Sequence, residues 1–540
     1  LLSLRGDWRP VDNWTLDAQL GALEIKNDWP RQQKYKYRPD GFNIGYDVSE
    51  TFNPRFRYNN FTLNEILASP ELFDEFDEVV LQPRDAEDTT LRAELNSRYE
   101  LQTSALSAVH VGLQLQNREK ERVQSKLKVD SNTQPLTDFL GDGVAIPGSN
   151  TFLEQLDGGF PWIGSILAPI ENLQDGIIPP GGIEVPPNQL DSFNVEEDVV
   201  AGYLRADFDF GNGWTGNIGN RVVYTDFTSA GFENVNGTVA PVAFNEDYTQ
   251  NLPSGTINYA VRDNLIIRGS GGRAMVKPQF ANLAPRRSVN EDERTINQGN
   301  PDLDPFLATQ GDLSIEWYFA DGGLLAVAGL YKKIESFIFD QTRVRNLPNP
   351  EAFGADPALA GEQFTITQPL NGSGAEVWGF EFSWQQPFGI FSDALRGFGI
   401  QSNWTYLDSS ANFSANLAGE DQAAGEGFSA QNFGLPGISD HVVNATLYYD
   451  LSPITVRLAY NYRTEFLISP AGAEGQPEFI ADFDQLDVFA GYDVAPNITV
   501  FVEGINLTNE PLRRFSNPGE KIELFSDNGF RLFAGVRAKF

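Results

Sequence analysis

Apolar and polar residues alternate along this chain in segments of about ten residues, each closed by turn-forming residues. In the final segment, one parity is apolar, as at Leu532 and Val536, while the other carries Arg531 and Arg537. Side chains of a β-strand point alternately to its two faces, so each segment predicts a strand with one apolar and one polar wall. The chain is therefore expected to be all-β.

Soluble β-sandwiches show the same alternation, but two features favour an antiparallel β-barrel in a membrane. The connections alternate between short turns, such as 210–214, 319–324 and 450–454, and long segments, as in outer-membrane barrels. No apolar run approaches the ~20 residues that a membrane helix needs, so a membrane location would require a barrel. Aromatic residues also stand at predicted strand ends, as in interfacial girdles: Trp14, Trp214, Trp404, Tyr460, Tyr462 and Phe540.

The alternation predicts 17 strands, and this odd number has a consequence. Bacterial barrels have an even strand number with both ends on the periplasmic side, so we expect the sequence to begin inside a barrel whose wall has a gap. Residue 1 opens no signal peptide. The strands are expected near 2–9, 14–26, 88–101, 104–118, 197–210, 214–227, 248–261, 265–277, 308–319, 324–340, 374–386, 397–408, 440–450, 454–466, 482–493, 498–510 and 528–540.

The composition narrows the classes of function. The chain has 39 Lys and Arg against 74 Asp and Glu, a net charge of −35, which argues against nucleic acid as a partner. It has no cysteine and only two histidines, so disulfides and thiolate sites are excluded and no metal site or cofactor is predicted. Nucleotide-binding and hydrolase motifs are absent from the sequence, and an enzyme is not expected.

Three segments resemble the TonB-dependent outer-membrane receptors. Residues 273–285 (RAMVKPQFANLAP) are similar to that family's R-x-x-x-R-P-x-x-x-x-L-x-P signature, with Lys277 in place of the usual arginine. Residues 299–319 resemble its N-P-x-L-x-P-E segment, with Phe306 in place of glutamate, and residues 504–511 resemble its penultimate-strand motif. The order and spacing of the three motifs strengthen the resemblance, which the strand rhythm extends to the whole chain.

The resemblance implies a 22-stranded barrel in the outer membrane of a Gram-negative bacterium. Residues 1–540 would form the barrel domain, and five strands, the N-terminal plug and the TonB box would precede them. Transport would be driven by the TonB complex, acting through the plug. Other expected partners are outer-membrane lipid and lipopolysaccharide, a nutrient ligand and, as an optional partner, a surface lipoprotein.

Candidate ligand-binding residues lie in the long connections. Segment 131–197 has ten carboxylates and no Lys or Arg, and Phe160 and Trp162 could form a lid that stacks on a ligand. The alternative is a solvated acidic loop. Segment 27–87 offers an aromatic and basic surface with Trp29, Tyr35 and Tyr37, or it packs on its neighbours.

Two arginines directly follow the first motif. Arg286 and Arg287 could grip an anionic group, but pairing with the acids at 291–293 is the stronger expectation.

These features predict a TonB-dependent importer of a scarce nutrient. An oligosaccharide is favoured over a ferric siderophore, because a chain of −35 repels anionic siderophores at long range. The alternatives are a passive porin-like channel and, less favoured, a barrel enzyme.

Overall fold

The computed structural model describes residues 1–29, 33–38, 44–47, 55–58, 75–101, 105–130, 185–235, 238–413, 432–470, 476–516 and 521–539. Among these residues, 17 long strands pair in sequence, each antiparallel to the next. The predicted antiparallel all-β fold and the predicted strand number are confirmed. The strands are β1 (Leu2–Val11), β2 (Trp14–Trp29), β7 (Arg84–Glu100), β8 (Leu106–Gln124), β10 (Phe193–Gly211), β11 (Trp214–Val235), β12 (Thr238–Arg262), β13 (Leu265–Val276), β16 (Phe306–Ala320), β17 (Gly323–Asn346), β19 (Ala375–Pro387), β20 (Phe398–Asn412), β22 (His441–Leu451), β23 (Ile454–Arg463), β26 (Phe483–Ala495), β27 (Ile498–Ile505) and β30 (Arg531–Ala538).

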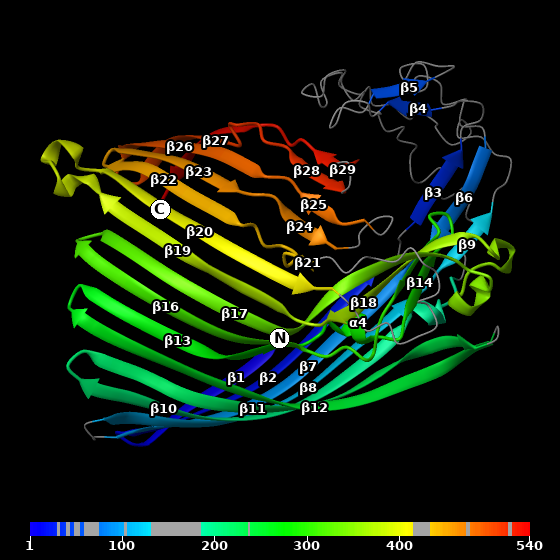
Figure 1. The fold of residues 1–540 in the computed structure, drawn as a ribbon, viewed down its shortest axis with the longest axis horizontal. Coiled ribbons are helices and arrows are strands. Elements are labelled where there is room, and N and C mark those ends of the chain that lie inside the picture. Colours follow the sequence, from blue (N-terminus) through cyan, green and yellow to red (C-terminus); the bar gives the residue numbers. More distant parts are fainter. Residues whose placement is uncertain are drawn as a thin grey trace.

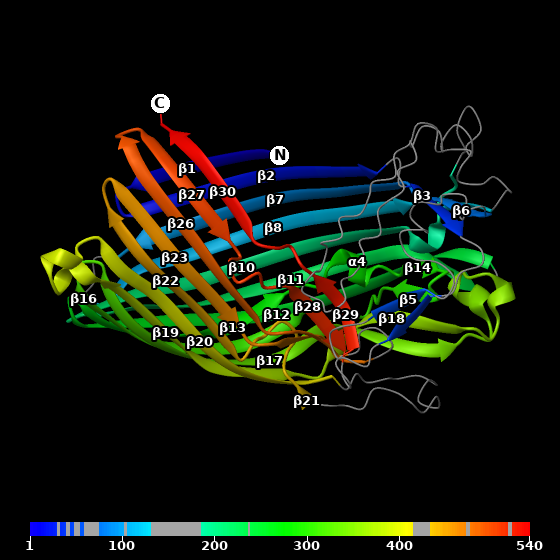
Figure 2. The same cartoon turned by 90° about the horizontal axis from the view of Figure 1, so that it is seen from above.

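The sheet curves into a barrel wall that the described residues leave open. Each end strand, β1 and β30, pairs with one neighbour, and no pairing joins the two among these residues. Figure 2 shows them on the same side of the barrel. The described residues also contain no compact α/β domain inside the wall. No helix among them has the length and apolar character needed to cross a lipid bilayer.

Short turns and long connections lie at opposite ends of the barrel, as predicted (Figure 1). The short turns use residues that tolerate left-handed backbone: in the β10–β11 turn, Asn212 has φ 49° and Gly213 has φ 84°. The opposite end carries shorter elements: β3 (Gln33–Arg38), β4 (Ile44–Asp47), β5 (Arg55–Tyr58), β6 (Glu75–Leu81), β9 (Leu127–Asp130), α4 (Phe280–Leu283), β14 (Arg287–Asn290), β15 (Thr295–Gln298), β18 (Gln363–Gly372), β21 (Asn432–Phe433), β24 (Phe466–Ser469), β25 (Glu478–Ile480), β28 (Leu512–Ser516) and β29 (Lys521–Ser526).

One predicted long connection is wrong. Residues 228–247 were expected to form a loop, but β11 runs on to Val235 and β12 starts at Thr238. The two strands pair without a register shift from Val235 opposite Thr238 to Trp214 opposite Tyr259. Beyond the bilayer polar and apolar residues are mixed on both faces of these strands, so the alternation that marks a strand within lipid fades there.

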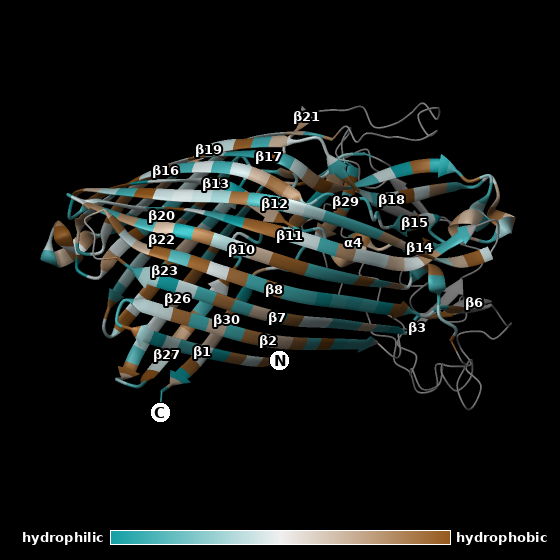
Figure 3. Ribbon diagram, turned by 90° about the horizontal axis from the view of Figure 1, so that it is seen from below, coloured by the Kyte–Doolittle hydropathy of each residue, from teal (hydrophilic) through white to brown (hydrophobic). Residues whose placement is uncertain are grey.

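The outer wall is apolar, with aromatic residues at both borders. On β11, Trp214 stacks on Tyr259 at 4.2 Å near the short turns, and Tyr224 lies ten residues further along the same face. Ten residues of a strand tilted by about 40° rise roughly 25 Å, the height of the lipid-facing band in such barrels. Apolar and polar residues alternate along the strands in Figure 3.

The register predicted for the last strand agrees with this outer wall. Val536 is 68% exposed and lies opposite Val500, another exposed aliphatic residue. Arg537 lies on the other face, with its guanidinium carbon 5.7 Å from the centre of the Phe501 ring.

Apolar cores fill the inner side at the long-connection end. The first packs Phe337 and Phe339 from β17 edge-on against Phe413, with ring centres 5.3 and 5.2 Å apart. The second holds α4 against the inner face of β10 and β11, with Phe280 and Leu283 buried on it. Residues 280–284 and Leu303 of the segment 277–305 therefore lie against the inner face of the wall.

Candidate functional site

A basic surface lines the inner wall beside α4, near the long-connection end. It comprises seven cationic side chains and three carboxylates, which leaves four net positive charges in a chain of net charge −35. The strand pairing and ion pairs bring them together from β7, β8, β10 and the segments next to α4. Asp191 ends the short 3-10 helix Gln189–Asp191 before β10, and Lys126 follows β8 and donates to the Val289 carbonyl at 3.0 Å. We call this set the basic wall: Arg84, Arg118, Lys120, Arg122, Lys126, Lys277 and Arg286, with Asp88, Asp191 and Glu197.

Lys277, the family-motif position, anchors the 277–305 segment to β10. Its Nζ lies 3.0 Å from Glu197 Oε2, and the Glu197 side chain is only 6% exposed. Burial lowers the pKa of Lys277, while Glu197 opposes that shift. Arg118 lies 4.6 Å over the Phe280 ring and donates two hydrogen bonds to Asp88, at 3.0 and 2.6 Å. Lys277 and Arg118 therefore hold the segment against the adjacent strands β10 and β8.

A second group joins two arginines through one buried carboxylate. Arg122 Nη2 donates to Asp191 Oδ2 at 3.4 Å, and Arg286 Nη1 lies 3.5 Å from Asp191 Oδ1. The Arg122 Nε is buried without a hydrogen-bond partner. Two guanidiniums thus share one carboxylate, an arrangement that attracts an additional anionic or hydrogen-bond-accepting group.

The expected pairing of Arg286 and Arg287 with the acids at 291–293 is wrong. Arg286 turns back toward Asp191 and donates to the Ala281 carbonyl at 3.0 Å. Arg287 donates to the Ala352 carbonyl at 2.9 Å and lies 5.2 Å over the Phe353 ring, and burial lowers its pKa. Only Arg286 therefore belongs to the basic wall, because Arg287 packs into the neighbouring core of β15 and β18.

Other predicted site residues lie beyond what the structure can place. Phe160 and Trp162 are outside the described residues, as are the side chains of Trp29, Tyr35 and Tyr37. The basic residues of β7 and β8 were missed as a site. Their even-numbered spacing is visible in the sequence, but the approach of Asp191 and Lys277 depends on the fold.

His110 occupies the inner wall, as its parity predicts. Its Nε2 lies 2.8 Å from Asp207 Oδ2, and Arg205 Nε donates to the other oxygen of Asp207 at 2.6 Å. Asp207 is therefore part of a network on the inner wall. Among the described residues, no group of three or more acids, histidines or cysteines is arranged to hold a metal ion.

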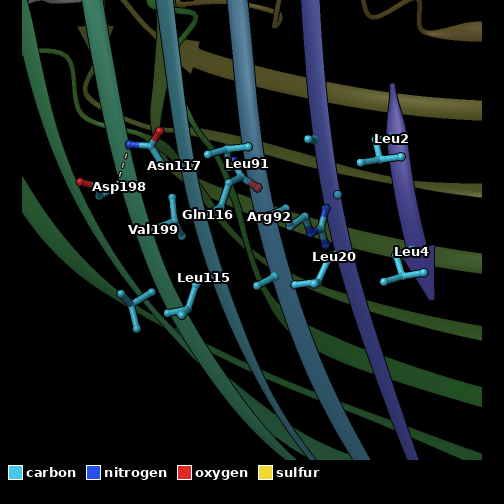
Figure 4. Close-up of a pocket in the computed structure, with 14 residues that line it drawn as sticks. Leu2, Leu4, Leu20, Leu91, Arg92, Leu115, Gln116, Asn117, Asp198 and Val199 are labelled. Atoms are coloured by element: carbon cyan, nitrogen blue, oxygen red, sulfur yellow. Dashed lines mark hydrogen bonds between the residues drawn. The ribbon is translucent and has the colours of Figure 1, made fainter. Parts of the chain in front are cut away.

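An apolar groove of about 760 Å³ crosses the first strands, but it faces outward (Figure 4). Leu20, Leu91 and Leu115 line it and are 47–56% exposed on the outer wall. Asn117 closes its polar end with a 3.0 Å hydrogen bond to Asp198. This groove belongs to the lipid-facing surface and does not open onto the basic wall.

Several solved structures share this fold. The siderophore receptor PiuA from Acinetobacter baumannii is 13% identical, with a TM-score of 0.55, over 99% of this chain and 64% of that one. The ferric yersiniabactin uptake receptor FyuA from Yersinia pestis is 11% identical, with a TM-score of 0.55, over 100% and 60%. The ferric-catecholate import receptor Fiu from E. coli K12 is 13% identical, with a TM-score of 0.57, over 99% and 63%. The chain thus spans less than two thirds of each.

At these identities the likeness establishes the fold alone. No curated protein sequence matches the chain. A family model does match, described as TonB dependent receptor-like, beta-barrel, and it covers residues 2–507. The compared structures are receptors and transporters rather than enzymes. The chain belongs to the TonB-dependent receptor β-barrel family.

Proposed function

We propose that this chain is the barrel domain of an outer-membrane receptor in a Gram-negative bacterium, which imports a scarce nutrient by TonB-dependent transport. The observation that carries this proposal is the basic wall. The inner face of a wide barrel bears fixed charges, and these charges hold a segment that is folded against that face. A barrel of this width cannot be filled by its own side chains, so its polar interior suits a plug or water. The TonB complex is the proposed energy source, and outer-membrane lipid and lipopolysaccharide surround the apolar wall.

The folded-in segment favours a gated receptor over a passive channel. Residues 277–305 and the core around Phe413 occupy the inner side at the long-connection end. A passive channel would need a continuous water path there. A surface lipoprotein remains a proposed additional partner at that end.

The basic wall favours an anionic ligand, and a ferric siderophore is therefore proposed ahead of an oligosaccharide. The preference for oligosaccharide rested on the net charge of the chain and on the acidic segment 131–197. A ligand inside the barrel instead meets a net positive charge on the wall beside α4, because the seven cations of the basic wall outnumber its three carboxylates and the nearby Asp340. The names of the compared structures, which include siderophore receptors, support the same choice.

Uptake by the full-length receptor in cells with and without TonB tests the proposal. Radiolabelled iron is supplied as hydroxamate, catecholate or carboxylate chelates, and labelled oligosaccharides are supplied in parallel. We expect uptake of one iron chelate that disappears without TonB. Uptake that persists without TonB would indicate a passive channel, and TonB-dependent uptake of oligosaccharide alone would overturn the anionic ligand.

A matched pair of variants on β8 tests the basic wall itself. Arg118→Ala with Arg122→Ala should weaken chelate binding, since both side chains face inward. Glu119→Ala with Glu121→Ala changes two charges on the outer face of the same strand and should leave binding unchanged.

A further inference from the structure

The outer half of β12 has one open edge. β12 pairs with β11 without a break from Thr238 to Tyr259. On its other side it pairs with β13 only from Ser254 to Arg262, because β13 parts from β12 after Gly272 while it stays paired with β16 as far as Val276. Among the described residues, positions 238–253 therefore have a strand on one side only.

The direction of the backbone groups on this edge follows from one hydrogen bond. The Ala260 N–H donates to the Gly213 carbonyl, on the β11 side. The N–H and C=O groups of successive residues in a strand point alternately to its two neighbours. Because the β11–β12 register has no shift, these groups point to β11 at every even-numbered residue of β12. The N–H and C=O groups of residues 243, 245, 247, 249 and 251 therefore point to the open side.

Two prolines bracket these five positions. Pro241 and Pro253 are odd-numbered, and the N–H groups of odd-numbered residues face the open side. Proline has no N–H, so neither residue can donate a hydrogen bond on that side. The β11 ladder is thus left intact, while the open edge is limited to a stretch between the two prolines. That stretch is long enough for a short extended segment.

The edge opens near the outer border of the bilayer. Thr249 lies opposite Tyr224, the outer aromatic border of β11. Within the lipid both edges of a strand must be paired. β12 is paired on both sides from Ser254 toward the short turns, so the pairing with β13 ends five residues on the membrane side of Thr249. Above Tyr224 the edge is accessible from water on the long-connection side.

A row of three acids runs across the outer face to this edge. Asp198 lies opposite Asp226, and Asp226 lies opposite Asp247. Like charges placed directly opposite on neighbouring strands destabilise a sheet. A cationic side chain next to Asp247, supplied from the open side, would relieve that repulsion.

We propose that residues 243–251 of β12 receive an extended segment of a partner protein at the cell surface. The segment adds a strand to the open edge and places a lysine or arginine next to Asp247. Main-chain hydrogen bonds to five alternate residues give affinity, and the acid row selects a basic segment. This surface lies on the outer face of the wall and is independent of the basic wall and of the transported ligand.

Binding of a designed peptide tests the proposal. The probe is a fluorescent nine-residue peptide of alternating valine and threonine with lysine at its centre, added to the full chain in detergent micelles. A second peptide carries glutamate at the centre. We expect saturable anisotropy with the lysine peptide, weaker binding of the glutamate peptide, and slower hydrogen exchange at the amides of 243–251.

Three variants make the test specific. Asn245→Pro with Thr249→Pro removes two open-side donors without touching the β11 ladder and should weaken binding by about tenfold, the effect of losing two net hydrogen bonds of modest strength. Asp247→Asn should weaken binding of the lysine peptide only, whereas Asp263→Asn, the same change at the short-turn end of β12, should have no effect. Heat-modifiable migration on gels checks that each barrel assembles.

Three outcomes would overturn the proposal. The first is the absence of saturable binding by the lysine peptide to the wild-type chain. The second is binding of the lysine peptide that slows hydrogen exchange at amides outside 243–251 and not at amides within it. The third is dimerisation of the chain that the proline pair abolishes, because a second copy would then occupy the edge.

Discussion

The ion pair between Lys277 and Glu197 is predicted to hold the 277–305 segment inside the barrel. Lys277→Met removes the cation and leaves Glu197, 6% exposed, without its closest partner. Breaking a buried pair on one side costs about 3–5 kcal/mol. Here Lys277 is 26% exposed and the positive charge of Arg118 also acts on Glu197. We therefore expect a smaller cost than this range, about 2–3 kcal/mol.

A double-mutant cycle separates the pair from its surroundings. Glu197→Gln alone should cost less, because Lys277 can reach water. The double variant Lys277→Met with Glu197→Gln should cost less than the sum of the singles, by about 1–2 kcal/mol. Lys277→Arg, which restores the residue usual in the family motif, should keep the pair.

Hydrogen exchange of the receptor in nanodiscs measures these differences locally. Amides of 277–305 should open about 30- to 150-fold more often in Lys277→Met, which follows from 2–3 kcal/mol. Amides of β19 and β20 serve as the internal control and should not change. Unchanged exchange in 277–305, or strictly additive effects in the cycle, would refute the anchoring role of the pair.

Three further predictions follow from other parts of the molecule. Val536→Arg places a charge on the lipid face and should cost about 2–4 kcal/mol of barrel stability, measured as a lower urea midpoint in lipid vesicles. A substitution at the inward-facing Arg537 should not lower the urea midpoint. Phe413→Ala should cost about 3–5 kcal/mol in local opening of the first core, measured by hydrogen exchange, with exposed Phe391→Ala as the neutral control. Burial raises the pKa of Glu510, so between the ordinary and the raised pKa the folded loop binds more protons than the unfolded loop. The local stability near residues 506–516 should therefore fall as pH rises through that window. Glu510→Gln should abolish this pH dependence, measured by hydrogen exchange corrected for intrinsic rates.

The strands within the bilayer could be predicted from the sequence because lipid imposes a simple local rule. One face must be apolar and the other polar, so parity alone places Val536 outward and Arg537 inward. The rule ends where the lipid ends. Around Thr228 and Asn245 polar and apolar residues are mixed on both faces, and the prediction of a loop at 228–247 was wrong for that reason. The Asn-Gly pair at 236–237 was the remaining local sign of a tight hairpin.

The site was less predictable because its contacts join distant parts of the chain. Acids at 291–293 are close to Arg286 in sequence, and the prediction chose them. The structure instead pairs Arg286 with Asp191, which the strand register brings beside Arg122. A guanidinium can reach any acid that the fold places near it, so sequence distance gave little information. The even-numbered cations of β8 could have been identified by parity alone.

The total charge of a barrel protein is a weak guide to the sign of the charge on its ligand. The sum of −35 combines acids on the outer face, such as Asp226 and Asp247, with cations on the inner face. In physiological salt, charges are screened over about 8 Å, so a ligand beside the basic wall responds mainly to that wall. The acids at the surface affect how often an anionic ligand arrives, because they act on its approach. The affinity depends on the groups that it meets inside, where Arg122 and Arg286 share one carboxylate. Replacing Asp191 with Asn would raise the local positive charge further, and an anionic ligand should then bind more tightly if it reaches this pair.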